Sequence, residues 1–180
     1  MNLPNIITIG RILIVPFTVW LIISEEFAFA FIAFVTAGVS DGIDGYIARH
    51  FNQRTELGAY LDPLADKALL VSIYVSLGLL KVIPAWLVIL VVTRDVLIVG
   101  AFILSWVLGK PIIVAPSLMS KVNTAGQIVL AGVVLGVLAV KIDPISLLDV
   151  GYLAVAILTF GSGALYMRDW FHHMTNGTQG

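Results

Sequence analysis

Four aspartates close together in the chain are the side chains best suited to chemistry. Asp41 and Asp44 are three residues apart and Asp62 and Asp66 are four apart, so on helices each pair projects from one face. Two such faces brought together would form a pocket of carboxylates. Carboxylate oxygens without histidine or cysteine beside them favour Mg²⁺, Mn²⁺ or Ca²⁺ over zinc or copper. We therefore expect a site for one divalent ion or a pair of them, and a pair with Arg49 nearby suits a diphosphate substrate.

The composition indicates a membrane protein. Hydrophobic residues make up 59% of the chain and charged residues only 12%, with a mean hydropathy of +1.03, whereas charged residues are about 25% of a soluble domain. The net charge of -1 gives no excess of cations for binding nucleic acid. The absence of cysteine excludes disulfides and thiolate chemistry. No Lys or Arg precedes the first apolar run, so a cleavable signal peptide is not expected.

Six apolar segments have the length of about 20 residues that a membrane-spanning helix needs. They predict an all-α integral membrane protein of six transmembrane helices in one membrane-embedded domain, 1–180. Glycines on the fifth segment, at Gly126, Gly132 and Gly136, are spaced for close helix packing. The expected spans are 7–24, 27–48, 60–80, 84–107, 121–140 and 146–168.

The placement of Lys and Arg predicts the orientation. With six spans, both termini share one side with the loops at 49–59 and 108–120, and this side holds most of the cations. Since cytoplasmic loops carry the excess of Lys and Arg, the termini and the aspartates are expected at the cytoplasmic face of a bacterial inner membrane. The cations on that side are Arg11, Arg49, Arg54, Lys67, Lys110, Lys121 and Arg168, against Lys81 and Lys141 on the other.

The spacing D-x2-D-G-x2-A-R-x8-G-x3-D-x3-D, from Asp41 to Asp66, resembles the signature of the CDP-alcohol phosphotransferase family at every specified position. The resemblance implies a six-helix membrane enzyme, a homodimer, in which an alcohol displaces CMP from a CDP-linked lipid with the help of two Mg²⁺ or Mn²⁺ ions. It also implies that Asp66 is the general base. The implied metal ligands are Asp41, Asp44, Asp62 and Asp66, and the implied CDP site is Asp41, Asp44, Gly45, Ala48, Arg49 and Gly58.

Segments outside the signature are most similar to the cardiolipin synthase subfamily and next to the phosphatidylglycerophosphate synthases, which tend to have Glu in place of Asp95 and Lys in place of Asn123. Glycerol 3-phosphate carries about two negative charges and phosphatidylglycerol one, so a site with one cation fewer fits the latter. We expect CDP-diacylglycerol and phosphatidylglycerol as substrates, with glycerol 3-phosphate as the alternative acceptor. Arg94, Lys121 and Asn123 are the expected acceptor-binding residues, with Asp95 positioning Arg94.

Two simpler interpretations stay open. Carboxylates also cluster inside membranes along ion pathways, so an intramembrane divalent-cation carrier is the alternative of another class. Arg94 and Asp95 could be a structural ion pair, although neighbours on a helix point in different directions and each is therefore expected to have another partner. Lys121 could be only a cytoplasmic anchor.

Overall fold

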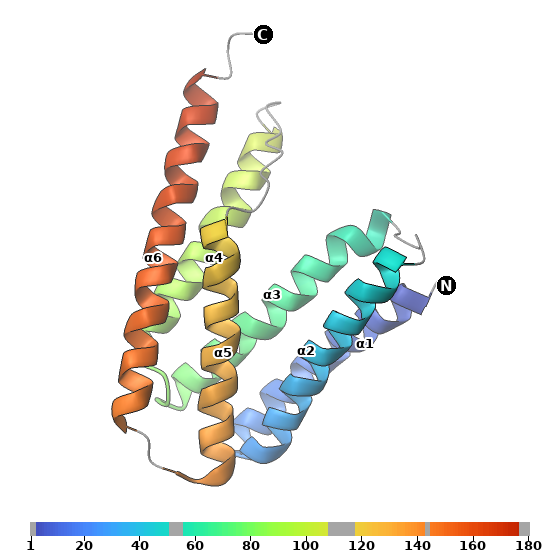
Figure 1. The fold of residues 1–180 in the computed structure, drawn as a ribbon, viewed down its shortest axis with the longest axis vertical. Coiled ribbons are helices and arrows are strands. Elements are labelled where there is room, and N and C mark those ends of the chain that lie inside the picture. Colours follow the sequence, from blue (N-terminus) through green and yellow to red (C-terminus); the bar gives the residue numbers. More distant parts are fainter. Residues whose placement is uncertain (1–2, 51–55, 108–117, 143–144, 177–180) are drawn as a thin grey trace. The chain divides into compact units, whose positions relative to one another are not determined.

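The computed structural model consists of helices (Figure 1). It describes the backbone of residues 3–50, 56–107, 118–142 and 145–176, and the side chains of 13–40, 67–101, 104–105, 118–142, 148–172 and 174–175. The helices are α1 (Leu3–Ile23), α2 (Phe27–His50), α3 (Glu56–Leu79), α4 (Ala85–Val107), α5 (Leu118–Val140) and α6 (Ile145–Asn176).

Each apolar segment expected to span the membrane is a helix, so the all-α class is confirmed. The largest differences from the predicted bounds are at the starts of α1 and α3 and at the end of α6, and α3 begins at Glu56 rather than 60. α1 begins at Leu3 rather than 7, because a proline such as Pro4 is tolerated in the first turn of a helix. α6 continues to Asn176 rather than ending at 168, because residues 169–176 contain neither Gly nor Pro and polar residues alone do not end a helix.

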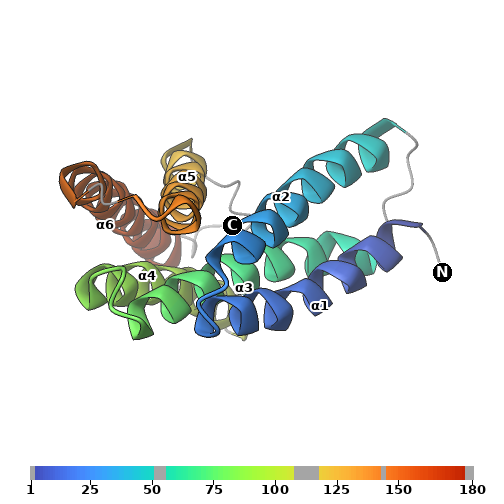
Figure 2. The ribbon, with the colours of Figure 1, turned by 90° about the horizontal axis from the view of Figure 1, so that it is seen from below.

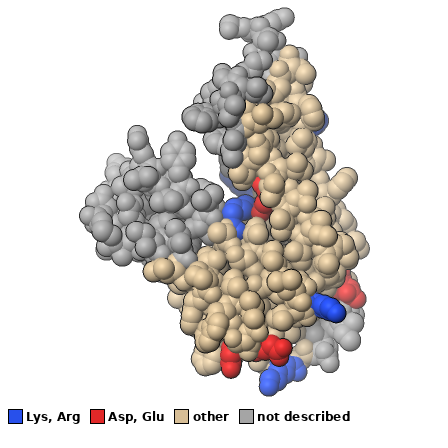
Figure 3. All heavy atoms as spheres, turned by 180° about the vertical axis from the view of Figure 1, so that it is seen from behind, with Lys and Arg blue, Asp and Glu red and all other residues tan. Residues whose placement is uncertain are grey.

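Two helical stretches among the described residues, Leu118–Val140 and Leu148–His172, are long and apolar enough to cross a membrane. Shorter apolar stretches occur at Leu13–Ile23, Phe27–Ser40 and Lys67–Leu79. On the face shown in Figure 3, the described surface is mostly uncharged. The two long stretches agree with a membrane protein, while the crossing of the membrane by all six helices stays a prediction.

The chain divides into two compact units, and α5 contributes to both. The first consists of Met1–Val82 and Ala131–Pro144, and the second of Ile83–Leu130 and Ile145–Gly180. In the first unit α1 packs against α2 and α3. A Cβ at Gly132 would lie 3.4 Å from the Phe34 ring, and one at Gly136 would lie 3.4 Å from the Phe31 ring. These glycines bring α5 close to α2, as their spacing predicts; the single domain stays a prediction.

In the second unit α4 runs parallel to α6. The Tyr166 hydroxyl of α6 donates to the Ile98 carbonyl at 3.3 Å, and further along both helices the Trp170 indole N–H donates to the Ser105 hydroxyl at 2.9 Å. Residue numbers thus rise together along the two helices. Parallel directions are what a fourth and a sixth span require.

α5 runs antiparallel to α6 in the same unit. A Cβ at Gly126 would lie 3.1 Å from Leu158, and one at Gly151 would lie 3.0 Å from Leu130. Residue numbers rise on one helix as they fall on the other. Glycine at these positions lets the two helices approach closely, which confirms the packing role predicted for Gly126.

Three short connections share one helix-ending motif. Glu25, Lys81 and Lys141 have φ of 59°, 60° and 56°, in the left-handed region that usually requires glycine. After α5, the Lys141 N–H donates to the Leu138 carbonyl at 3.2 Å and the Ile142 N–H to the Val137 carbonyl at 3.3 Å. This pair of bonds is the Schellman motif. The helices α1, α3 and α5 thus end in the same way.

We expect Lys141→Gly to raise the free energy of unfolding by about 1 kcal/mol, because glycine lacks the Cβ that penalises a left-handed backbone. Lys141→Ala is the matched control: it removes the charge but keeps the Cβ and gains little. Thermal unfolding of the purified protein in detergent measures both variants. Equal melting temperatures for the Gly and Ala variants would contradict the strain at this position.

Candidate functional site

The backbone places all four predicted metal ligands on helices. Asp41 and Asp44 lie in the last third or so of α2, and Asp62 and Asp66 lie in the first half of α3. The C-terminal end of α2 and the N-terminal ends of α1 and α3 lie at one end of the first unit (Figures 1 and 2). The helical setting of both pairs is therefore confirmed. The side chains of these residues, and of Gly45, Ala48, Arg49 and Gly58, lie outside the described part, so their roles stay predictions.

The donor chemistry of the four aspartates fits divalent metal ions. Carboxylates spaced i, i+3 near the end of α2 and i, i+4 near the start of α3 offer hard oxygen ligands, and Mg²⁺ or Mn²⁺ ions prefer such ligands. Among the residues with described side chains, which do not include these aspartates, no group of three or more His, Asp or Glu could hold a metal ion.

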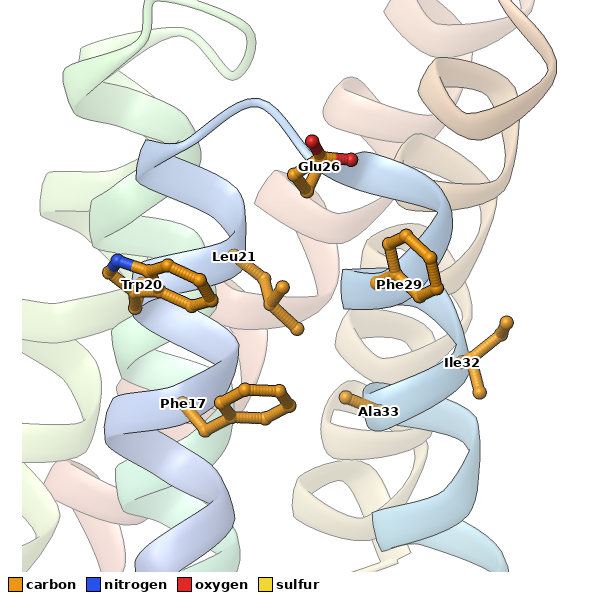
Figure 4. A pocket seen from close by; sticks show the side chains of 7 residues that line it. All are labelled: Phe17, Trp20, Leu21, Glu26, Phe29, Ile32 and Ala33. Carbon is orange, nitrogen blue, oxygen red and sulfur yellow. The ribbon is translucent and has the colours of Figure 1, made fainter.

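A groove of about 440 Å³ opens between α1 and α2, beside their connecting turn and away from the aspartates (Figure 4). Its lining is apolar except for the single carboxylate of Glu26. A groove of this kind suits a hydrocarbon chain better than a charged diphosphate, so it is not the predicted catalytic site. The lining residues are Phe17, Trp20, Leu21, Glu26, Phe29, Ile32 and Ala33.

In the second unit, a buried arginine joins three helices. Arg94 of α4 is only 4% exposed, and its Nη1 donates to the Asp95 carboxylate at 2.7 Å. Its Nη2 donates to the hydroxyls of Ser120 on α5, at 2.5 Å, and Ser162 on α6, at 2.7 Å. A buried guanidinium needs both a counter-charge and hydrogen-bond acceptors, and these three residues provide them.

Buried amides extend this cluster along α5 and α6. The Thr159 hydroxyl donates to Asn123 Oδ1 at 2.8 Å, and Gln127 Nε2 donates to the Thr159 hydroxyl at 3.4 Å. All three residues are fully buried. Ser120, Asn123 and Gln127 are spaced i, i+3, i+7 and so share one face of α5. We call the whole set the polar seam: Arg94, Asp95, Ser120, Asn123, Gln127, Thr159 and Ser162.

Three buried hydroxyls elsewhere in the described helices donate their hydrogen bonds locally. Thr18, Ser76 and Ser105 each donate to a carbonyl four residues earlier in their own helix, the usual arrangement for such residues. In the polar seam the bonds cross between helices. Side-chain contacts of this kind fix the relative positions of α4, α5 and α6.

The polar seam keeps unused hydrogen-bond donors. Within the described part of the chain, Arg94 Nε and Asn123 Nδ2 are buried and have no partner. A buried N–H without a partner costs about 1–3 kcal/mol. These two N–H groups are the seam's candidates for binding oxygen atoms.

The seam contains two of the three predicted acceptor-binding residues. Arg94 and Asn123 both lie in it, whereas Lys121 is exposed and is not a partner of either among the described contacts. Arg94 also contacts its neighbour Asp95 directly, as in the structural ion-pair interpretation, and it has the further partners that were expected, Ser120 and Ser162. The long arginine side chain bends back to reach the carboxylate. Asp95 thus contacts Arg94, as a positioning role requires.

Sequence reasoning missed the other members of the seam. Each of them is a single polar residue in an apolar segment, and such a residue usually bonds within its own helix. They are Ser120, Gln127, Thr159 and Ser162. The available signal was helical spacing, since Ser120 and Gln127 share a face of α5 with Asn123, and Thr159 and Ser162 are three residues apart on α6.

Comparison with known proteins gives a family and several relatives. A model of the CDP-alcohol phosphatidyltransferase family matches residues 1–164. Human cardiolipin synthase (CMP-forming) is 39% identical over 145 residues, 72% of this chain and 48% of that protein. A probable cardiolipin synthase (CMP-forming) of Drosophila melanogaster is 34% identical over 152 residues, 76% of this chain and 47% of that protein.

A bacterial relative has a different name. The CDP-diacylglycerol–glycerol-3-phosphate 3-phosphatidyltransferase of Bacillus subtilis is 32% identical over 143 residues, 71% of this chain and 73% of that protein. The chain spans about half the length of the human and Drosophila relatives.

We expect Thr159→Val to lower the free energy of unfolding by about 1–3 kcal/mol, because it leaves the buried Asn123 Oδ1 without its donor. Thr159→Ser keeps the hydroxyl and should recover most of the loss. Thr36→Val is the matched control, since the Thr36 hydroxyl is exposed and bonds its own helix; a change within about 0.5 kcal/mol is expected there. Thermal unfolding measures all three. Equal effects of the two valine variants would contradict the inter-helix bond.

Proposed function

The chain belongs to the CDP-alcohol phosphatidyltransferase family, and on that premise we propose that it transfers the phosphatidyl group of CDP-diacylglycerol to phosphatidylglycerol, which yields cardiolipin and CMP. The match of the family model over residues 1–164, which include the aspartate signature, carries the proposal. The names of the human and Drosophila relatives favour this acceptor. The name of the Bacillus relative makes glycerol 3-phosphate the second candidate, with phosphatidylglycerophosphate as its product.

The reaction replaces one phosphate ester bond with another. A hydroxyl oxygen of the acceptor bonds to the phosphorus that carries diacylglycerol, and the bond from this phosphorus to the bridging oxygen of the diphosphate breaks. CMP departs with the electron pair. The hydroxyl is a poor nucleophile until a base takes its proton, and the Asp66 carboxylate receives that proton.

Four carboxylates of the signature would hold the two divalent ions, Mg²⁺ or Mn²⁺. When bound, such ions stabilise the charge on a departing phosphate. The small residues of the signature leave room for the nucleotide beside α2 and α3, and Arg49 supplies a fixed cation for the diphosphate. The ligands are Asp41, Asp44, Asp62 and Asp66, and the small residues are Gly45, Ala48 and Gly58.

Arg94 and Asn123 bind the phosphate of the acceptor. Their unused buried N–H groups support this role, and an ionisable residue inside a membrane bundle is commonly functional. Lys121, at the exposed side of α5, adds a cation from outside the seam.

The protein works as a homodimer in the bacterial inner membrane, with six spans and with its termini and aspartates on the cytoplasmic side. The excess of Lys and Arg on that side supports this orientation. The opposite directions of α5 and its neighbours α4 and α6 support alternate crossing.

Removing divalent metal should abolish CMP release. We expect the purified protein, given CDP-diacylglycerol and phosphatidylglycerol, to release CMP only with Mg²⁺ or Mn²⁺ and only when the acceptor is present. Turnover that persists in chelator would contradict the metal-assisted reaction. Metal flux into sealed liposomes without lipid substrate, together with no CMP release, would favour the cation carrier.

Asp66→Asn should lower turnover by a factor of about 10² to 10⁴, the usual contribution of a general base, while binding of CDP-diacylglycerol is retained. Asp149→Asn removes an exposed carboxylate outside the signature and should leave the rate near that of the wild type. CMP release and equilibrium binding of the CDP-lipid measure the two effects. An Asp66→Asn rate within a few-fold of wild type would remove Asp66 from this role.

A further inference from the structure

We propose that the apolar groove between α1 and α2 binds an acyl chain of a phospholipid whose headgroup carries a primary ammonium, and that the Glu26 carboxylate accepts hydrogen bonds from this ammonium. The groove lies at the opposite end of α2 from Asp41 and Asp44. The inference therefore depends on the setting of α1 and α2 in a membrane and not on the proposed reaction.

The lining of the groove suits a hydrocarbon chain. Its volume of about 440 Å³ is within the range of about 300–1,000 Å³ that is usual for ligand pockets. Phe17 and Trp20 of α1 stack with their ring centroids 6.0 Å apart and face Phe29 and Ile32 of α2 across the groove (Figure 4). Each of these four side chains is more than half exposed, so an acyl chain can cover apolar surface that the protein leaves open.

The groove has the depth of one leaflet of a bilayer. Phe17 comes six residues before the end of α1 at Ile23, and Ala33 comes six residues after the start of α2 at Phe27. At 1.5 Å per residue both lie about 9 Å from the connecting turn, and half of the hydrocarbon core of a bilayer is about 15 Å thick. A lipid in the groove therefore has its headgroup at the turn.

The turn presents carboxylates to that headgroup. Glu25 and Glu26 are both exposed, and Glu26 lines the groove. The Glu26 N–H donates to the Leu21 carbonyl at 2.9 Å, and the Glu26 carbonyl accepts from the Ala30 N–H at 3.0 Å. These bonds hold the backbone of Glu26 in place and leave its carboxylate available. Within the described part of the chain, neither carboxylate has an ion-pair partner.

A cation lies at about the same level as these carboxylates. Gly136 of α5 packs against Phe31 of α2, and the two helices are antiparallel. Lys141 comes five residues after the first of these, and Glu26 comes five residues before the second. The same end of the first unit thus carries both signs of charge. A zwitterionic headgroup, with an ammonium and a phosphate, matches this arrangement better than an anionic headgroup, which the two glutamates would repel.

A comparison of two zwitterionic lipids tests the role of Glu26. Phosphatidylethanolamine has a primary ammonium that can donate N–H bonds to a carboxylate, whereas phosphatidylcholine has three methyl groups in place of these hydrogens. With the same acyl chains, the two lipids make the same contacts in the groove. Since exposed ion pairs are weak, we expect the site to prefer phosphatidylethanolamine by about two- to fivefold.

Quenching of Trp20 fluorescence measures this preference in bilayers. The full-length protein would be reconstituted in phosphatidylcholine with increasing fractions of either lipid carrying brominated acyl chains, and the signal of Trp20 is the difference between wild type and Trp20→Phe. Equal quenching by the two brominated lipids would indicate ordinary bilayer contact and overturn the proposal. Absence of quenching by both would show that protein, such as a second copy of the chain, covers the groove, and would overturn it too. The readout does not use CMP release, so a failure of the proposed function would be seen separately.

Variants separate the headgroup from the acyl chain. Glu26→Gln removes the charge and should bring the preference to about one. Glu26 also lies at the N-terminal end of α2, where a carboxylate stabilises the helix, but this effect cancels when two lipids are compared in one variant. An unchanged preference in Glu26→Gln would refute the ammonium site.

Filling the groove tests the chain. Ala33→Phe should weaken the quenching of Trp20 by both lipids and abolish the preference, because the acyl chain loses its dispersion contacts. Val39→Phe is the matched control, since it places the same ring on an exposed part of α2 outside the groove, and it should behave as the wild type. Preference retained in Ala33→Phe would contradict binding in the groove. If Ala33→Phe does not fold, the exposed substitution Glu26→Gln still decides the proposal.

Discussion

A guanidinium buried among apolar helices must have its charge and its N–H groups matched by other side chains. Arg94 meets this requirement with a carboxylate on its own helix and with hydroxyls on α5 and α6. The requirement fixes how these helices align, because Ser120 and Ser162 must both face α4. The contacts of Tyr166 and Trp170 further along α4 continue the same parallel alignment. Asn123 is buried as well, because it lies on the same face of α5 as Ser120.

The charged groups of this apolar chain are neutralised in two different ways. Arg94 is neutralised from within the protein by Asp95. The four aspartates of the signature lie on α2 and α3 with Arg49 as the nearby cation of that segment, so under the proposed function metal ions supply most of their counter-charge. Under the proposed function, the aspartates would bind the diphosphate through metal ions, and Arg94 with Asn123 would bind the phosphate of the acceptor.

The sequence predicts the helices well and the buried contacts poorly. A spanning helix needs about 20 apolar residues, and such segments are visible without any tertiary information. The end of α6 was predicted too early because hydropathy falls after Arg168 although the helix continues. Ser162 and Thr159 could not be distinguished from Ser76, which bonds its own helix, because only contacts with neighbouring helices separate them. The aspartates were recognisable because their spacing and composition are unusual in an apolar chain.

The central claim, that a phosphatidyl group passes from CDP-diacylglycerol to a phosphodiester lipid, is tested most directly by the identity of the product. Purified protein would be given labelled CDP-diacylglycerol, Mg²⁺, and phosphatidylglycerol together with glycerol 3-phosphate, and the labelled lipids would be identified by mass spectrometry. The account predicts labelled cardiolipin as the main product. Labelled phosphatidylglycerophosphate alone, or no labelled product lipid, would contradict it.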